Sequence, residues 1–157
     1  MDSFVKVLEE ALEARQGSGD WLESVKTIQT YSFLKPTFPA ILVEPKSWEM
    51  LAAPSDGYIY RKMDAVVMVL CHIGTNDKVT TVASELDALV LKVIRALHQN
   101  LTLTTTTYAA GYTHKQRPLE IGNETYGMGV VEGSSCYAAE IPVSVPQIRR
   151  NGVITLT

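Results

Sequence analysis

Hydrophobic positions recur at helical spacing in two segments of the chain, residues 3–15 and residues 80–98. Both patterns predict an amphipathic helix with one apolar stripe. The first stripe consists of Phe4, Val7, Leu8, Ala11 and Leu12, and the second of Val82, Leu86, Leu89, Val90, Val93, Ile94 and Leu97. The turn-forming run Gly17-Ser18-Gly19-Asp20 is expected to follow the first helix.

Two segments between these helices have the composition of strands. Residues 40–44 form a short apolar run between prolines, which favours a strand buried on both faces. Residues 58–73 carry the longest β-branched and aromatic run, which predicts a long central strand antiparallel to the first. Residues 46–57 are expected to form a long connection between the two strands.

A hairpin is predicted near the end of the chain. Residues 126–132 and 137–145 read as its strands, and Gly133-Ser134-Ser135 as its turn. Pro142 has no N–H to donate, so the second strand is expected at a sheet edge or a bulge, and Pro146 is expected to end it. Residues 101–118 are expected to form a strand fragment followed by an exposed loop.

The element order is helix, strands, helix, strands, without strict alternation. It predicts an α+β fold with a mostly antiparallel sheet and two main helices packed on one face. Residues 1–146 are expected to form a single domain, with residues 147–157 as a C-terminal tail. The uncharged, β-prone run from Val153 to Thr157 leaves two alternatives, an assembly arm that pairs with a neighbouring subunit or an added strand of its own sheet.

Composition limits the possible functions. The 157 residues, of which 46% are hydrophobic, are enough for one core, so a two-domain enzyme is not expected. The net charge of −3 lacks the basic excess that binds nucleic-acid phosphates. The sequence shows no secretion signal and no apolar run long enough for a membrane span, so a soluble, intracellular protein is expected.

Candidate chemistry is sparse. The three histidines lack metal-ligand spacing, and Cys71 and His72, as neighbours on a strand, should point to opposite faces. Glu120, Glu124 and Glu132 lie beside turns or strands, where a solvated charge is the ordinary role. The sequence therefore predicts no enzyme and no catalytic, cofactor-binding or metal-binding residue.

Aromatic residues next to charges, in segments that cannot be core, instead suggest protein contacts. The loop 111–118 and the connection 46–57 have this character, although a purely solvated loop remains the alternative. The candidate interface residues are Trp48, Tyr112, His114, Lys115, Arg117, Arg149, Arg150, Val153 and Ile154.

The element order resembles that of the tail terminator proteins of long-tailed bacteriophages, with minor tail and head–tail joining proteins close behind. The elements that carry the resemblance are the N-terminal helix, the strand ending Ile41-Leu42-Val43-Glu44-Pro45, the long strand through Val66-Val67-Met68-Val69-Leu70, the helix 80–98, and the hairpin closing on Tyr137-Ala138-Ala139-Glu140-Ile141-Pro142-Val143. The likeness covers about residues 1–145.

The resemblance implies a structural virion protein that is assembled in the host cytoplasm. Its subunits would form a six-fold homomeric ring that caps the tail tube, ends tail polymerisation and joins the tail to the head connector. Its partners would be the tail tube protein and a head-completion or connector protein, while DNA would pass through the lumen without specific binding. The alternatives are another neck or minor tail protein or, from a different class, a small cytosolic enzyme or ligand-binding domain.

Overall fold

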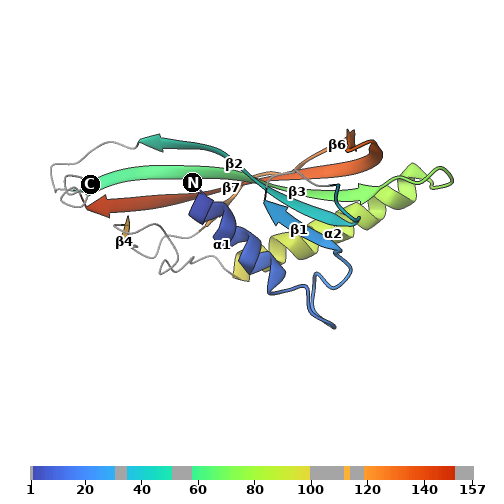
Figure 1. Ribbon diagram of the computed structural model, residues 1–157, viewed down its shortest axis with the longest axis horizontal. Coiled ribbons are helices and arrows are strands. Elements are labelled where there is room, and N and C mark those ends of the chain that lie inside the picture. The colour runs from blue at the N-terminus through green and yellow to red at the C-terminus, as the bar shows by residue number, and fades with distance from the viewer. Residues whose placement is uncertain (1, 31–34, 51–57, 100–111, 114–118, 151–157) are drawn as a thin grey trace.

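The computed structural model describes residues 2–30, 35–50, 58–99, 112–113 and 119–150. Two helices and seven strands occur in this part of the chain, in an α+β arrangement (Figure 1). In chain order they are α1 (Asp2–Glu13), β1 (Thr27–Thr30), β2 (Ala40–Met50), β3 (Tyr58–His72), α2 (Val79–Gln99), β4 (Tyr112–Thr113), β5 (Glu120–Ile121), β6 (Thr125–Val131) and β7 (Ser134–Arg150). The predicted fold class is confirmed.

The strands form one sheet in the order β1-β2-β3-β7, and β4, β5 and β6 each pair with the far edge of β7. Every pairing is antiparallel except that of β1 with β2. The longest ladder joins β3 to β7, from Tyr58 opposite Arg150 to His72 opposite Cys136. This two-stranded ladder is the centre of the sheet. β2 pairs with its β3 side, β4, β5 and β6 pair with its β7 side, and β1 pairs with β2.

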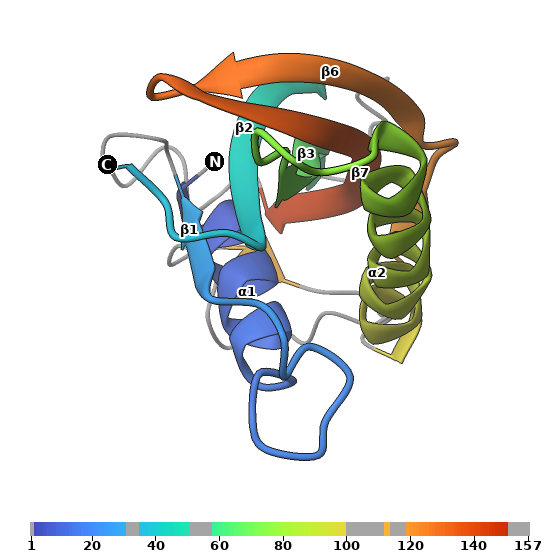
Figure 2. The same cartoon turned by 90° about the vertical axis from the view of Figure 1, so that its right-hand side faces the viewer.

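Both helices pack on the same face of the sheet (Figure 2). Leu8 and Leu12 of α1 and Leu86 and Val90 of α2 are buried there against alternate side chains of the central strands. On the opposite, helix-free face, a small second cluster contains Ala40, Leu42, Leu70 and Cys136. Residues 40–43 are therefore buried on both faces, as their continuous apolar run predicts.

The prediction that Pro146 ends the last strand is wrong, because β7 continues to Arg150. The N–H of Ile73 donates to the carbonyl of Ser135, so the odd-numbered residues of β7 point their peptide groups at β3. Pro142 and Pro146 are even-numbered, and their missing N–H groups face the other edge. The ladder with β3 therefore loses no hydrogen bond at either proline.

Pro142 does not mark a sheet edge either, because β7 has strands on both sides. It lies opposite the interruption between β5 and β6, where the N–H of Gly122 donates to the Pro142 carbonyl at 2.8 Å. A Cβ added to Gly122 would lie 2.7 Å from Pro142 Cγ, so this close approach requires glycine. A short gap in the neighbouring ladder accommodates the proline in mid-sheet.

The predicted connection over residues 46–57 is wrong in its first part. β2 continues to Met50 after a register shift between Pro45 and Ser47, and a β-bulge of this kind lets a strand pass a proline. Of the predicted tail 147–157, residues 147–150 belong to β7, so the assembly-arm prediction now concerns residues 151–157, which lie outside the described part. Apart from Tyr112 and Thr113, residues 101–118 also lie outside it.

Candidate assembly surface

The nine residues predicted to form an interface fall mostly outside the described part of the chain. His114, Lys115, Arg117, Val153 and Ile154 all do. The backbone positions of the other four are fixed by strand register: Tyr112 of β4 lies opposite Arg149 of β7, next to Arg150, and Trp48 of β2 lies opposite Met63 of β3. The fold therefore brings Tyr112 together with Arg149 and places Trp48 on a different strand.

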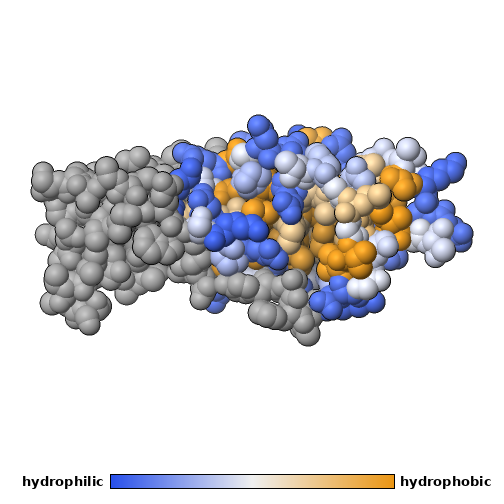
Figure 3. Space-filling view, turned by 90° about the horizontal axis from the view of Figure 1, so that it is seen from above, coloured by the Kyte–Doolittle hydropathy of each residue, from blue (hydrophilic) through white to orange (hydrophobic). Residues whose placement is uncertain are grey.

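Exposed hydrophobic residues mark a second candidate for an assembly surface. Among the residues whose burial is described, the large hydrophobic side chains that are exposed all belong to α2 or β6. Their exposed fractions are 45% for Val79, 63% for Leu91, 42% for Tyr126, 68% for Met128 and 69% for Val130. Figure 3 shows hydrophobic residues lying among hydrophilic ones on one face of the molecule. We call these five residues the α2–β6 surface.

The two elements of this surface are in direct contact. The Tyr126 hydroxyl donates a hydrogen bond of 3.1 Å to Asp87 Oδ1 on α2. Partial desolvation, the hydrogen bond and the nearby carboxylate charge together raise the pKa of Tyr126 to about 12. This contact holds the start of β6 against the exposed side of α2.

The hairpin that joins β6 to β7 has a well-defined turn type. Glu132 and Gly133 form its two-residue turn with φ values of 47° and 79°, the left-handed pair that a type I′ turn needs. In such a hairpin the pair that closes the turn, here Val131 and Ser134, exchanges both hydrogen bonds. Along β6, the peptide groups of the even-numbered residues therefore point away from β7.

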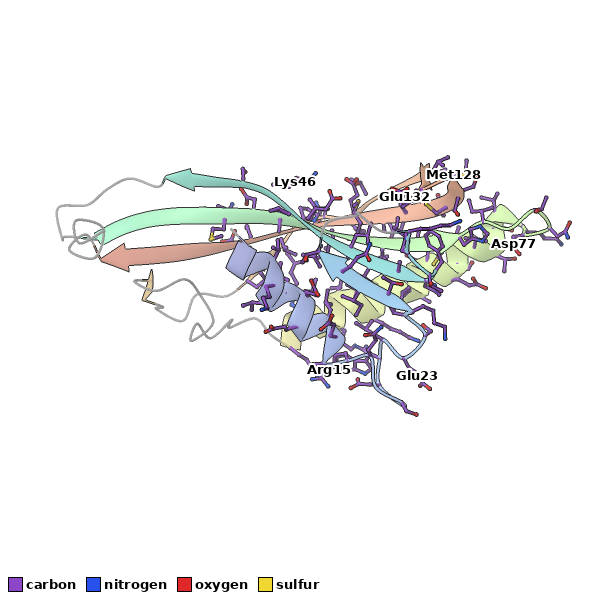
Figure 4. All side chains as sticks on the ribbon, in the orientation of Figure 1. Arg15, Glu23, Lys46, Asp77, Met128 and Glu132 are labelled. Atoms are coloured by element: carbon purple, nitrogen blue, oxygen red, sulfur yellow. The ribbon has the colours of Figure 1, made fainter. Side chains whose placement is uncertain are left out.

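Among the described strands, β6 is thus an edge strand, and its outward peptide groups belong to the same residues as its large apolar side chains. Tyr126, Met128 and Val130 alternate along one face of β6, as strand geometry requires. Figure 4 shows Met128 on the outer part of the hairpin, near Glu132 and away from α1. Native proteins usually protect such an edge with charges, prolines or a covering element.

The opposite face of β6 is open because it carries glycine. A Cβ added to Gly127 or Gly129 would meet no atom within 4 Å. A groove of about 350 Å³ runs over these glycines and is lined by Ala138 and Glu140 of β7. β6 therefore offers space on this face, and no described strand pairs with the peptide groups at its outer edge.

A second groove, of about 390 Å³, lies on the helix-free face beside β5. Its charged groups are paired: Lys62 Nζ lies 3.6 Å from Glu120 Oε2, and the buried Ser144 hydroxyl donates to the same oxygen at 3.3 Å. Ser47 donates to Asp64 Oδ2 at 3.3 Å. These contacts tie β2, β3, β5 and β7 together.

Trp21 is partly buried against the core, and two arginine side chains lie close to its ring. The guanidinium carbons of Arg15 and Arg95 are 5.1 Å and 5.6 Å from its ring centroid. Arg15 also pairs with Asp20 at 3.6 Å and donates to Gln99 at the end of α2. These contacts hold the segment after α1 against α2. Trp21 therefore extends the hydrophobic core beneath this connection.

The cysteines and histidines are arranged as strand geometry predicts. Cys71 is buried on the helix-covered face, whereas the neighbouring His72 is exposed on the other face and stacks on Phe38. Burial, followed by the charge of Glu85, raises the pKa of Cys71 to about 11. Burial also raises the pKa of Cys136. Both thiols therefore stay protonated near neutral pH and are poor nucleophiles.

In the described part of the chain, no three His, Cys, Asp or Glu side chains gather as a metal site would require. Neither described helix has both the length and the apolar character needed to cross a bilayer.

No protein-family model matches the sequence, and no curated protein matches it significantly.

Sequence reasoning missed the α2–β6 surface. The signal was present in Tyr126-Gly127-Met128-Gly129-Val130, where large apolar residues alternate with glycine. A half-buried strand normally alternates apolar with polar residues. Glycine in place of the polar residues leaves that face of the strand without side chains, which indicates open space there.

Proposed function

We propose that this protein is a structural virion protein that forms a six-fold homomeric ring at the end of a bacteriophage tail. The ring caps the tail tube, ends its polymerisation and contacts the head connector. The element order supports the comparison with tail terminators. The observation that carries the assembly role is the α2–β6 surface, where exposed apolar side chains lie beside a strand edge that no described strand occupies. A role as another neck or minor tail protein uses the same surface and differs in the ring's position.

The exposed side chains fit a buried contact better than a solvated surface. Aromatic residues and methionine are enriched in the centres of protein interfaces, and this surface contributes Tyr126 and Met128 beside aliphatic Leu91 and Val130. Val79, the first residue of α2, is also exposed. Protein contact would bury these exposed apolar side chains, which is the usual role of apolar residues gathered on a protein surface.

Electron microscopy of the purified protein, alone and in assembled particles, tests the proposal. We expect closed rings of six copies, at least in the particles. A single copy per particle, or density without rotational symmetry, contradicts the ring.

A substitution pair connects the ring to the surface. Met128→Lys places a charge on the exposed apolar face of β6 and should abolish rings while leaving the unfolding transition almost unchanged. Ser18→Lys adds the same charge at an exposed position in the turn after α1 and should leave ring formation intact. Equal ring yields from both variants would show that the α2–β6 surface is not the contact.

The predicted contact loop is tested separately, because it lies outside the described residues. Replacement of His114, Lys115 and Arg117 by serine should weaken assembly without changing thermal stability. Wild-type assembly in this variant means that the loop is only solvated.

A further inference from the structure

No described strand pairs with the outer edge of β6, so a strand from another molecule can add there in the assembly. We propose that residues 151–157 of a second copy of this chain add to β6 as an antiparallel strand. This inference rests on the proposed function, because it names the contact through which neighbouring subunits join. Three features support it: the outer edge of β6, the length of chain in residues 151–157, and the match between the two sequences.

The outer edge of β6 fits a partner that supplies backbone N–H and C=O groups. The peptide groups of Tyr126, Met128 and Val130 face away from β7 and have no strand partner in the described part of the chain. Strand addition satisfies such groups through main-chain hydrogen bonds, and side chains then fit on alternate faces. No charged residue and no proline lies within β6 to oppose this pairing.

The reach of residues 151–157 excludes their own β6. They follow Arg150, which lies opposite Tyr58 at one end of the sheet, whereas β6 begins opposite Glu140. Arg150 and Glu140 are about 33 Å apart along β7 at the usual strand rise. Seven residues span at most about 25 Å when fully extended. Figure 1 shows the end of β7 and β6 at opposite ends of the molecule, so the donor must be another copy.

The two sequences match as strand partners. The segment Val153-Ile154-Thr155-Leu156-Thr157 is uncharged and mostly β-branched. With Thr155 opposite Met128, Ile154 falls opposite Gly129 and Leu156 opposite Gly127. The two largest side chains of the donor then cover the two glycines, where the groove of about 350 Å³ is open. Aromatic cross-strand neighbours stabilise edge glycines in this way, and the two large aliphatic side chains of the donor take that place here.

The contact has a consequence for symmetry. The donor segment follows Arg150 at one end of β7, whereas the acceptor β6 pairs with the other end, so the interface joins unlike surfaces of two copies. Such a heterologous interface forms a ring when the rotation between subunits closes. Pairing of β6 with a second β6 would instead join two copies around a two-fold axis and end there.

Disulfide trapping between two different full-length variants tests the proposal. One variant carries Gly127→Cys, where the added side chain has free space, and the other carries Leu156→Cys. The variants are mixed at the concentration at which wild-type protein forms rings, exposed to a mild oxidant, and analysed by denaturing mass spectrometry. A disulfide-linked dimer is expected in the mixture and not with either variant alone, because each lacks the partner thiol. Cys71 and Cys136 are buried and give the background, which the wild-type protein measures.

Three further samples make the result decisive. Ser84→Cys, on the exposed side of α2, replaces Gly127→Cys as a matched control and should give no dimer with Leu156→Cys. Met128→Cys alone gives a dimer only if β6 pairs with β6, and this result overturns the proposal. If wild-type rings form and the mixture gives no linked dimer, the strand addition is wrong and the proposed function stands. If no oligomer of the wild-type protein forms under any condition, the proposed function itself fails.

Discussion

Strands β2 and β6 carry similarly apolar runs but lie in opposite environments. Ala40 to Val43 of β2 lie between β1 and β3, with side chains buried on both faces of the sheet. Within the described residues, Tyr126 to Val130 of β6 pair with β7 alone, and their large side chains are exposed. Apolar composition therefore identifies both as strands, whereas the position in the sheet decides which one stabilises the fold and which one can bind another chain.

The same contrast occurs within α2, and it gives the largest predicted effect. Leu86 is fully buried in the main core, whereas Leu91 on the same helix is exposed. Leu86→Ala should lower the free energy of unfolding by about 2–5 kcal/mol, because it leaves a cavity. Leu91→Ala should change it by less than about 0.5 kcal/mol. Urea unfolding of both variants measures the difference, and equal losses would mean that Leu91 is not a surface residue.

The glycines beside β7 give the second effect. Gly122→Ala places a methyl group 2.7 Å from Pro142 Cγ and should destabilise the protein by about 1–3 kcal/mol through overpacking. Gly127→Ala adds the same group to open space. It should raise stability by up to about 1 kcal/mol, because alanine restricts the unfolded chain. Destabilisation by Gly127→Ala would show that β6 is already covered in the isolated protein.

The element order and helix positions followed from the sequence because apolar spacing records which side of an element is buried. Leu86 and Val90 illustrate this, since their spacing alone placed them on the core side of a helix. The extent of β7 did not follow. A proline stops a strand only if its missing N–H faces a paired neighbour. The direction of that group depends on the register of β7 with β3, and the sequence around Pro146 does not reveal this register.

The candidate surface escaped sequence analysis for a related reason. Exposure of Met128 depends on the absence of a covering element over β6, which is a property of the whole sheet. The sequence places Trp48 in a predicted connection and Arg149 in a predicted C-terminal tail, yet both lie on strands. Irregular sequence pattern was therefore a poor guide to which segments are loops.

The buried thiol of Cys71 gives the third effect, and it distinguishes the core from the surface by pH. Its pKa is raised by burial from 9.0 to about 11, so the folded protein favours the protonated thiol. The resulting stability is fully present below pH 9 and is lost as pH rises through about 11, with a slope of at most about 1.4 kcal/mol per pH unit. Urea unfolding between pH 8 and pH 11 should show this loss, and Cys71→Ala should reduce it. An unchanged slope in that variant would assign the loss to other groups.

The smallest effect concerns the contact that joins β6 to α2. Tyr126→Phe removes the hydroxyl that donates to Asp87 and should cost only about 0.5 kcal/mol, because the pair is solvent-exposed. Absorbance titration provides the more sensitive measurement. Asp87→Asn removes the carboxylate charge and should lower the pKa of Tyr126 from about 12 towards, but not to, its ordinary value of 10.0, since partial desolvation remains. The difference between Asp87→Asn and the double variant with Tyr126→Phe assigns the titration to this tyrosine. If Asp87→Asn leaves that pKa unchanged, β6 is not held against α2 in solution, and the α2–β6 surface would have to be treated as two separate patches.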